Sequence, residues 1–280
     1  MASSEQVTRI RDALRDRPAD ARRMAGRLVG TAERSGDAAL LAMAYFLRGD
    51  AQQVLGDAAA AAADYAEARR RFRANGEERH ARLVDLSSLH VHALLGEKAV
   101  FRRTLARLRR QFPDAPARVV VEKAAGNGWR TLGDETSAEQ CFRDALARLG
   151  RKRDDASRRL RALVREDLAV SLGYRGAVRE ARRGLDRAAS ELAALGLRHA
   201  MVATAANRAW LDGIAGAPGW IDLEPLAGEL EQLGDRRRAL LARLDAADLR
   251  LRFGDARAAA RIAGTVVRGL ERAGLGPEAA

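Results

Sequence analysis

Apolar residues recur along this chain at spacings of three and four, in segments of about 12 to 20 residues, which is a normal length for a helix. No segment keeps the alternation of apolar and polar residues that a half-buried strand shows. Glycine or proline interrupts the segments at nearly regular intervals. The pattern predicts an all-α protein, an α-solenoid of about seven antiparallel helical hairpins, with about fourteen helices and no sheet.

Two series of glycines define the repeat. Steps of 40, 37, 40, 40 and 41 residues separate the members of the first series, Gly56, Gly96, Gly133, Gly173, Gly213 and Gly254. The second series runs half a period away, at Gly36, Gly76, Gly150, Gly196, Gly234 and Gly274. Its gap near Asp114 holds Pro113 and Pro116, which also interrupt helices. We expect a turn at each of these positions, and an earlier one at residues 16–18.

Five of the expected turns share the dipeptide Gly-Asp, at residues 36–37, 56–57, 133–134, 234–235 and 254–255. Glycine adopts the left-handed conformation that closes a helix, and aspartate caps the free amides at the start of the next one. Each dipeptide therefore predicts both the end of one helix and the beginning of another.

The charge balance invites a nucleic-acid hypothesis, since the net charge is +12. Lysine accounts for only three of the 50 basic residues, Lys98, Lys123 and Lys152, and arginine for the rest. Such a bias, together with abundant alanine and glycine, indicates a GC-rich genome in which arginine is the default solvated residue. Nucleic acid is therefore not the partner that we expect. A continuous basic stripe across neighbouring repeats would instead favour binding of nucleic acid or of an acidic protein.

The sequence indicates a cytoplasmic protein without a membrane span. Cys141 is the only cysteine, so no internal disulfide is possible. No apolar run approaches the ~18 residues of a transmembrane helix. Residues 1–5 lack the basic and apolar segments of a signal peptide.

The sequence contains no set of residues that would converge into a catalytic site, so we expect no enzyme, no cofactor and no metal. The four histidines are His80, His90, His92 and His199. His90 and His92 are two residues apart, which places them on different sides of a helix and not at the spacing of a metal pair. Cys141 has no evident histidine partner and is expected in the core. Residues 126–128, Gly-Asn-Gly, lack the strand and the Gly-Lys-Ser/Thr ending of a phosphate loop.

Two segments carry a family resemblance. Residues 44–72 read AYFLRGDAQQVLGDAAAAAADYAEARRRF, and residues 119–149 read VVVEKAAGNGWRTLGDETSAEQCFRDALARL. Gly49 and Gly126 come seven residues before the turn glycines Gly56 and Gly133. A small, an aromatic and a small residue follow each turn glycine five, nine and twelve residues later: Ala61, Tyr65 and Ala68 after Gly56, and Ala138, Phe142 and Ala145 after Gly133. Both segments resemble the tetratricopeptide (TPR) repeat consensus. The resemblance extends from about residue 40 to residue 273, and it implies a right-handed superhelix whose first helices line a concave groove.

The period near 40 residues exceeds the usual TPR length of about 34. It resembles the repeats that precede caspase-like CHAT protease domains in bacteria, and those in sensor halves of bacterial transcription regulators. We assign residues 1–274 to the repeat domain and residues 275–280 to a tail or linker. The chain would then be the repeat half of a larger effector, or a free-standing adaptor.

A polar column is expected along the groove. The residues six before each glycine of the first series are all polar: Asp50, His90, Asn127, Asp167, Asn207 and Asp248. Residues one helical turn away lie on the same face, and they include Leu244 and Leu251. The predicted ligand groove comprises Phe46, Asp50, Gln53, His90, Lys123, Asn127, Arg130, Asp167, Asn207 and Trp210. Trp129 is expected in the core, whereas for Trp210 core and groove remain open.

Lys123 and Asn127 match the first half of the family's carboxylate-binding clamp, but Leu160, Leu163 and Val164 stand where its other polar contacts would lie. A mixed groove therefore favours an extended peptide, whose backbone the polar residues would bind. The alternative is that these residues solvate an open surface or bond between neighbouring repeats. The predicted function is a protein-interaction scaffold or sensor. The other hypotheses are a receptor for a signalling peptide, and a nucleic-acid or acidic-protein binder.

Overall fold

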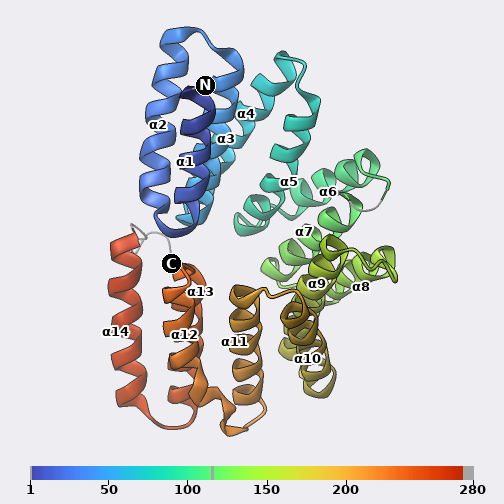
Figure 1. Cartoon of the computed structure of the whole chain (residues 1–280), viewed down its shortest axis with the longest axis vertical. Helices are drawn as coiled ribbons and strands as arrows, with labels where there is room; N and C mark the ends of the chain where they lie inside the picture. Colours follow the sequence, from blue (N-terminus) through green and yellow to red (C-terminus); the bar gives the residue numbers. More distant parts are fainter. Residues whose placement is uncertain (1, 115–116, 274–280) are drawn as a thin grey trace. The chain divides into compact units, whose positions relative to one another are not determined.

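The computed structural model describes residues 2–114 and 117–273, and within them every regular element is a helix (Figure 1). The elements are α1 (Ala2–Asp16), α2 (Pro18–Ser35), α3 (Ala38–Val54), α4 (Ala58–Ala74), α5 (Glu78–Leu94), α6 (Lys98–Gln111), α7 (Ala117–Thr131), α8 (Glu135–Leu149), α9 (Asp155–Tyr174), α10 (Val178–Ala194), α11 (Arg198–Ile214), the 3-10 helix η1 (Pro218–Asp222), α12 (Leu223–Gln232), α13 (Arg236–Arg252) and α14 (Ala256–Ala273). The all-α prediction of about fourteen helices is therefore confirmed. Gly274 and the predicted tail lie outside the described residues.

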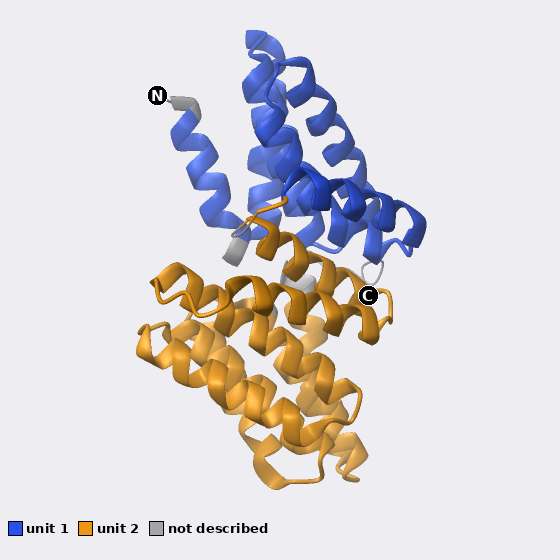
Figure 2. Ribbon diagram, turned by 90° about the vertical axis from the view of Figure 1, so that its right-hand side faces the viewer, with its two compact units in different colours: residues 1–112, 271–280 blue, residues 113–270 orange. Residues whose placement is uncertain are grey.

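Helices pack in antiparallel pairs, and each pair packs against the next along the chain within two compact units (Figure 2). One unit holds α1–α6, and the other holds α7–α13 together with α14 as far as Leu270. In each unit the first helices of successive hairpins also contact one another, as α3 does with α5 and α11 with α13. We call the surface that these helices form the first-helix face of the unit.

The Gly-Asp turns work as the sequence predicts. All five glycines have positive φ, between 69° and 86°. Each following aspartate accepts a hydrogen bond from the backbone amide three residues later, at 2.9 Å for Asp37 and 3.0 Å for Asp57, Asp134, Asp235 and Asp255. One dipeptide thus satisfies the end of one helix and the start of the next.

Two expected turn glycines are wrong: Gly173 and Gly213 lie inside α9 and α11. The residues with positive φ come three positions later, at Gly176 and Gly216. Gly173 serves packing instead, because a Cβ there would lie 2.9 Å from Cζ3 of Trp210. At Gly213 a Cβ would lie 2.4 Å from Leu249 Cδ1. The regular series of glycines therefore mixes two roles: some glycines form turns with positive φ, and others allow two helices to pack closely.

The same close approach explains the small residues of the two best-matching segments. A Cβ at Gly49 would lie 2.8 Å from the ring of Tyr65, and one at Gly126 would lie 2.4 Å from the ring of Phe142. Counting back from the true turns, Ala169 stands seven residues before Gly176 as Gly49 does before Gly56. The prediction that a small residue at this position lets paired helices touch is confirmed for Gly49 and Gly126.

Aromatic and thiol side chains mostly fill the core. Trp129, Cys141 and Phe142 are buried, as expected for the first two, and Trp210 is 9% exposed. Trp220, in η1, stacks on Phe253 with ring centroids 5.3 Å apart. No described helix is long and apolar enough to cross a membrane.

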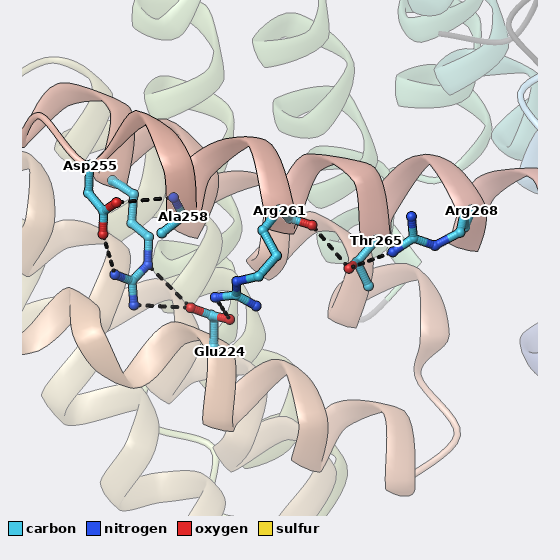
Figure 3. A network of polar contacts seen from close by, with 7 residues as sticks. Glu224, Asp255, Ala258, Arg261, Thr265 and Arg268 are labelled. Carbon is cyan, nitrogen blue, oxygen red and sulfur yellow. Dashed lines mark hydrogen bonds and ion pairs between the residues drawn. The ribbon is translucent and has the colours of Figure 1, made fainter.

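Arginine joins helices through buried or half-buried acids. Fully buried Asp85 of α5 accepts from Arg107 of α6 at 2.8 Å and from Arg69 of α4 at 3.2 Å. Glu224 of α12 holds Arg250 of α13 at 3.1 Å and Arg261 of α14 at 3.4 Å (Figure 3). Part of the basic excess is therefore internal structure and not solvated surface.

Candidate functional site

The first-helix face of the α1–α6 unit brings three of its four predicted groove residues together. The Tyr65 hydroxyl lies 2.6 Å from Oδ1 of Asp50 and 2.7 Å from Oε1 of Gln53. The ring of Phe46 lies 6.0 Å from that of Tyr65. Burial raises the pKa of Asp50 to about 6, although the hydrogen bond that Tyr65 donates to the carboxylate lowers it. His90 is half-buried on α5.

In the α7–α14 unit, the predicted residues of α7 are bonded to α9. Lys123 Nζ lies 2.7 Å from Oδ2 of Asp167, and Arg130 Nη2 lies 3.9 Å from its Oδ1. Arg130 also donates to Asn127 Oδ1 at 3.0 Å. The cations that the sequence analysis offered to a ligand therefore have a carboxylate of the next hairpin as partner. Lys123, the basic half of the clamp match, is one of them.

Farther along the face, Asn207 of α11 donates to Glu166 Oε1 of α9 at 2.7 Å. Glu166 is buried, and burial raises its pKa to about 7, although the positive charge of Arg238 opposes the shift. Trp210 packs under Tyr174, with ring centroids 4.7 Å apart. Trp210 thus belongs to the core and at the same time supports an exposed ring.

The polar column needs a correction in α9 and α11, because its register was counted from Gly173 and Gly213. Six residues before the true turns stand Val170 and Trp210. Asp167 and Asn207 lie nine residues before them, at the position that Asp245 occupies before Gly254 in α13. The column therefore does not run at one repeat position throughout the α7–α14 unit.

The outward side of α13 carries features that the sequence analysis did not select as ligand residues. Leu241, Leu244 and Leu251 are 50%, 44% and 60% exposed. We call these three side chains the leucine stripe. Spacings of three and seven residues place them on one side of α13, opposite buried alanines and Leu249. Tyr174, at the end of α9, is 61% exposed.

Asp245 adjoins the leucine stripe and is half-buried. Burial raises its pKa to about 6, and the negative charge of Asp248 adds to the shift. Neither a hydrogen bond nor an ion pair joins Asp245 to any side chain in the described parts of the chain. Tyr174 and Asp245 were missed because Tyr174 was counted into a turn and Asp245 was off the assumed register. A helical-wheel reading of α13 could have shown the stripe.

The described residues contain no group of three or more His, Cys, Asp or Glu side chains placed to hold a metal ion. In comparisons with known proteins, no family model and no curated protein matches this chain.

Proposed function

We propose that this chain is a protein-interaction module that binds a peptide or protein segment along the first-helix face of its α7–α14 unit. The observation that carries the proposal is the exposure of four large apolar side chains on the first helices α9 and α13, Tyr174 and the leucine stripe. Clustered exposed apolar residues rimmed by polar ones are typical of interaction surfaces.

The polar part of the face supports an extended ligand. Asn127, Asp167 and Asn207 lie on α7, α9 and α11 at intervals of about one hairpin, and each offers hydrogen-bonding atoms at a half-buried position. Peptides that cross neighbouring repeats use such groups for their backbone and apolar contacts for their side chains. Because Lys123 and Arg130 already hold Asp167, an acidic ligand would have to compete with that carboxylate.

A TPR-like origin of the repeats is part of the proposal. With the turn placed at Gly176, the residues five, nine and twelve later are Ala181, Leu185 and Ala188, all buried as their counterparts after Gly56 are. The corrected register thus strengthens the resemblance in a segment where the sequence alone gave a weak match. In this view the chain acts in the cytoplasm as the sensing half of a CHAT-type effector, or as an adaptor.

The test uses the purified full chain and a random-peptide display library. Peptides selected on the wild-type protein are remeasured on Leu244→Ser with Leu251→Ser. We expect at least a tenfold loss of affinity, because two exposed leucines contribute about 1 kcal/mol or more each when a ligand covers them.

The matched control is Val267→Ser on α14, a second helix, where the side chain is 53% exposed. Binding that survives both leucine changes but fails in the Val267 variant would place the partner on the second helices. That result would refute the proposed surface.

A further inference from the structure

Most half-buried and buried acids of the described chain pair with arginine, and Asp245 belongs to the few that do not. Among the residues that the structure describes, Asp50 and Glu166 also lack an ion pair but accept a hydrogen bond from Tyr65 and Asn207, and Glu135 has a buried Oε2 without a hydrogen-bond partner. Asp64 accepts from Arg48 at 2.7 Å, Asp85 from Arg107 at 2.8 Å, and Glu139 from Arg175 at 2.6 Å. In the described residues no cation approaches Asp245 within ion-pair distance. A partly desolvated carboxylate without a partner costs stability, and a cation supplied from outside would relieve that cost.

The surroundings of Asp245 suit a cation that arrives on an apolar segment. Tyr174 is near enough for the charge of Asp245 to add to the burial that raises the pKa of its hydroxyl. Its ring rests on Trp210 and exposes most of its surface, so a guanidinium or ammonium group can lie against it. A carboxylate beside an exposed aromatic ring is a favourable setting for Arg or Lys.

The leucine stripe extends this setting along α13. Leu244 and Leu251 flank Asp248, which is 55% exposed at its side chain and holds Arg252 at 2.8 Å. A segment lying along the stripe would therefore meet leucine, acid and leucine in turn. Charge complementarity favours a basic residue with apolar neighbours, and an acidic segment would face two carboxylates.

We propose that the α9–α11–α13 part of the first-helix face binds a segment in which a basic residue stands between apolar residues, the basic side chain entering beside Asp245 and Tyr174. This inference rests on the proposed function and specifies its ligand. The charge of this ligand is opposite to the charge that Lys123 and Arg130, the cations of the predicted groove, would attract if they were free of Asp167.

Fluorescence polarisation of the full chain can test it with three labelled nonapeptides, Gly-Leu-Ala-X-Leu-X-Ala-Leu-Gly, in which X is Arg, Gln or Glu. We expect the Arg peptide to bind about tenfold more tightly than the Gln peptide, and the Glu peptide to bind most weakly, because only Arg pairs with the acid. In Asp245→Asn the preference for Arg over Gln should fall to about twofold, the share that Asp248 retains at the rim.

The control variant is Glu180→Gln, which removes the same charge from an exposed position on the second helix α10 and should keep the full preference. Thermal melting of Asp245→Asn shows whether the variant is folded, and a melting temperature equal to or above that of the wild type is expected.

Equal binding of the three peptides to the wild type would overturn the inference, as would an Asp245→Asn variant that keeps the Arg preference, or no binding of the Arg peptide at millimolar concentration. If Leu244→Ser with Leu251→Ser weakens library peptides while Asp245→Asn changes nothing, the proposed function stands and the basic ligand is wrong.

Discussion

The two ends of the first-helix face in the α7–α14 unit differ in whether their charged side chains are paired. At the α7–α9 end, Lys123 and Arg130 share Asp167, so the charges are balanced within the protein. At the α13 end, Asp245 has no ion pair with any residue that the structure describes, and it lies beside exposed leucines. A polar residue on an inner face is therefore weak evidence for a ligand until its partners are known. An unpaired charge next to exposed apolar surface is stronger evidence.

The largest expected effect concerns Gly173 of α9, whose missing side chain leaves room for the Trp210 ring that packs against Tyr174. Gly173→Ala should cost about 1–3 kcal/mol of stability, because the added Cβ forces the Trp210 ring to move. In a variant whose only tryptophan is Trp210, its emission should shift. Denaturant unfolding and fluorescence measure the two effects.

Gly176→Ala is the comparison for that change. Gly176 has a φ of 79°, and a Cβ at this position would have no atom within 4 Å. We therefore expect a loss of about 1–2 kcal/mol of stability from backbone strain alone, without a change in Trp210 emission. An emission shift in the Gly176 variant but not in the Gly173 variant would contradict the register derived from the structure.

An intermediate effect is expected from Asp245→Asn. The pKa of Asp245 is raised from 3.8 to about 6 in the folded protein, so the folded state binds a proton more tightly than the unfolded state. Ionisation therefore lowers stability above this range, and stability returns as the pH falls through about 6 towards 4. The Asn variant should be about 1–2 kcal/mol more stable than the wild type near pH 7.5, after allowance for partial exposure.

Urea unfolding at about pH 7.5 and pH 4 measures this difference, which should nearly vanish at the lower pH. A variant less stable than the wild type at both pH values would show that Asp245 has a stabilising partner, and the contrast between the two ends would be lost.

The smallest effect is expected at the paired end. Asp167→Asn should destabilise the protein, opposite in sign to the same change at Asp245, because Lys123 loses its carboxylate. A double-mutant cycle with Lys123→Gln should give a coupling of about 0.5–1 kcal/mol for this partly exposed pair. Zero coupling, measured by urea unfolding at low salt, would mean that Lys123 is available to a ligand after all.

The sequence predicted the fold better than the site. Glycine followed by aspartate fixes a helix boundary by local backbone chemistry, so all five Gly-Asp turns were placed correctly. Gly173 and Gly213 were misplaced because glycine also serves where a ring or a leucine of another helix approaches, and no neighbour in sequence shows that need. Two glycines three residues apart were available at residues 173–176 and 213–216, and the spacing rule selected the wrong one of each pair.

Composition, the helical period and the capping residues by themselves determined that this chain is a series of helical hairpins, because those signals act over a few residues. Tertiary structure decided which polar residues of the face are occupied. Asp167 meets Lys123 across 44 residues, and Asn207 meets Glu166 across 41, so their pairing depends on how one hairpin packs on the next. Among the described residues the same packing places no cation within ion-pair distance of Asp245, because Tyr174, the α9 side chain near enough for the two groups to interact, carries no positive charge.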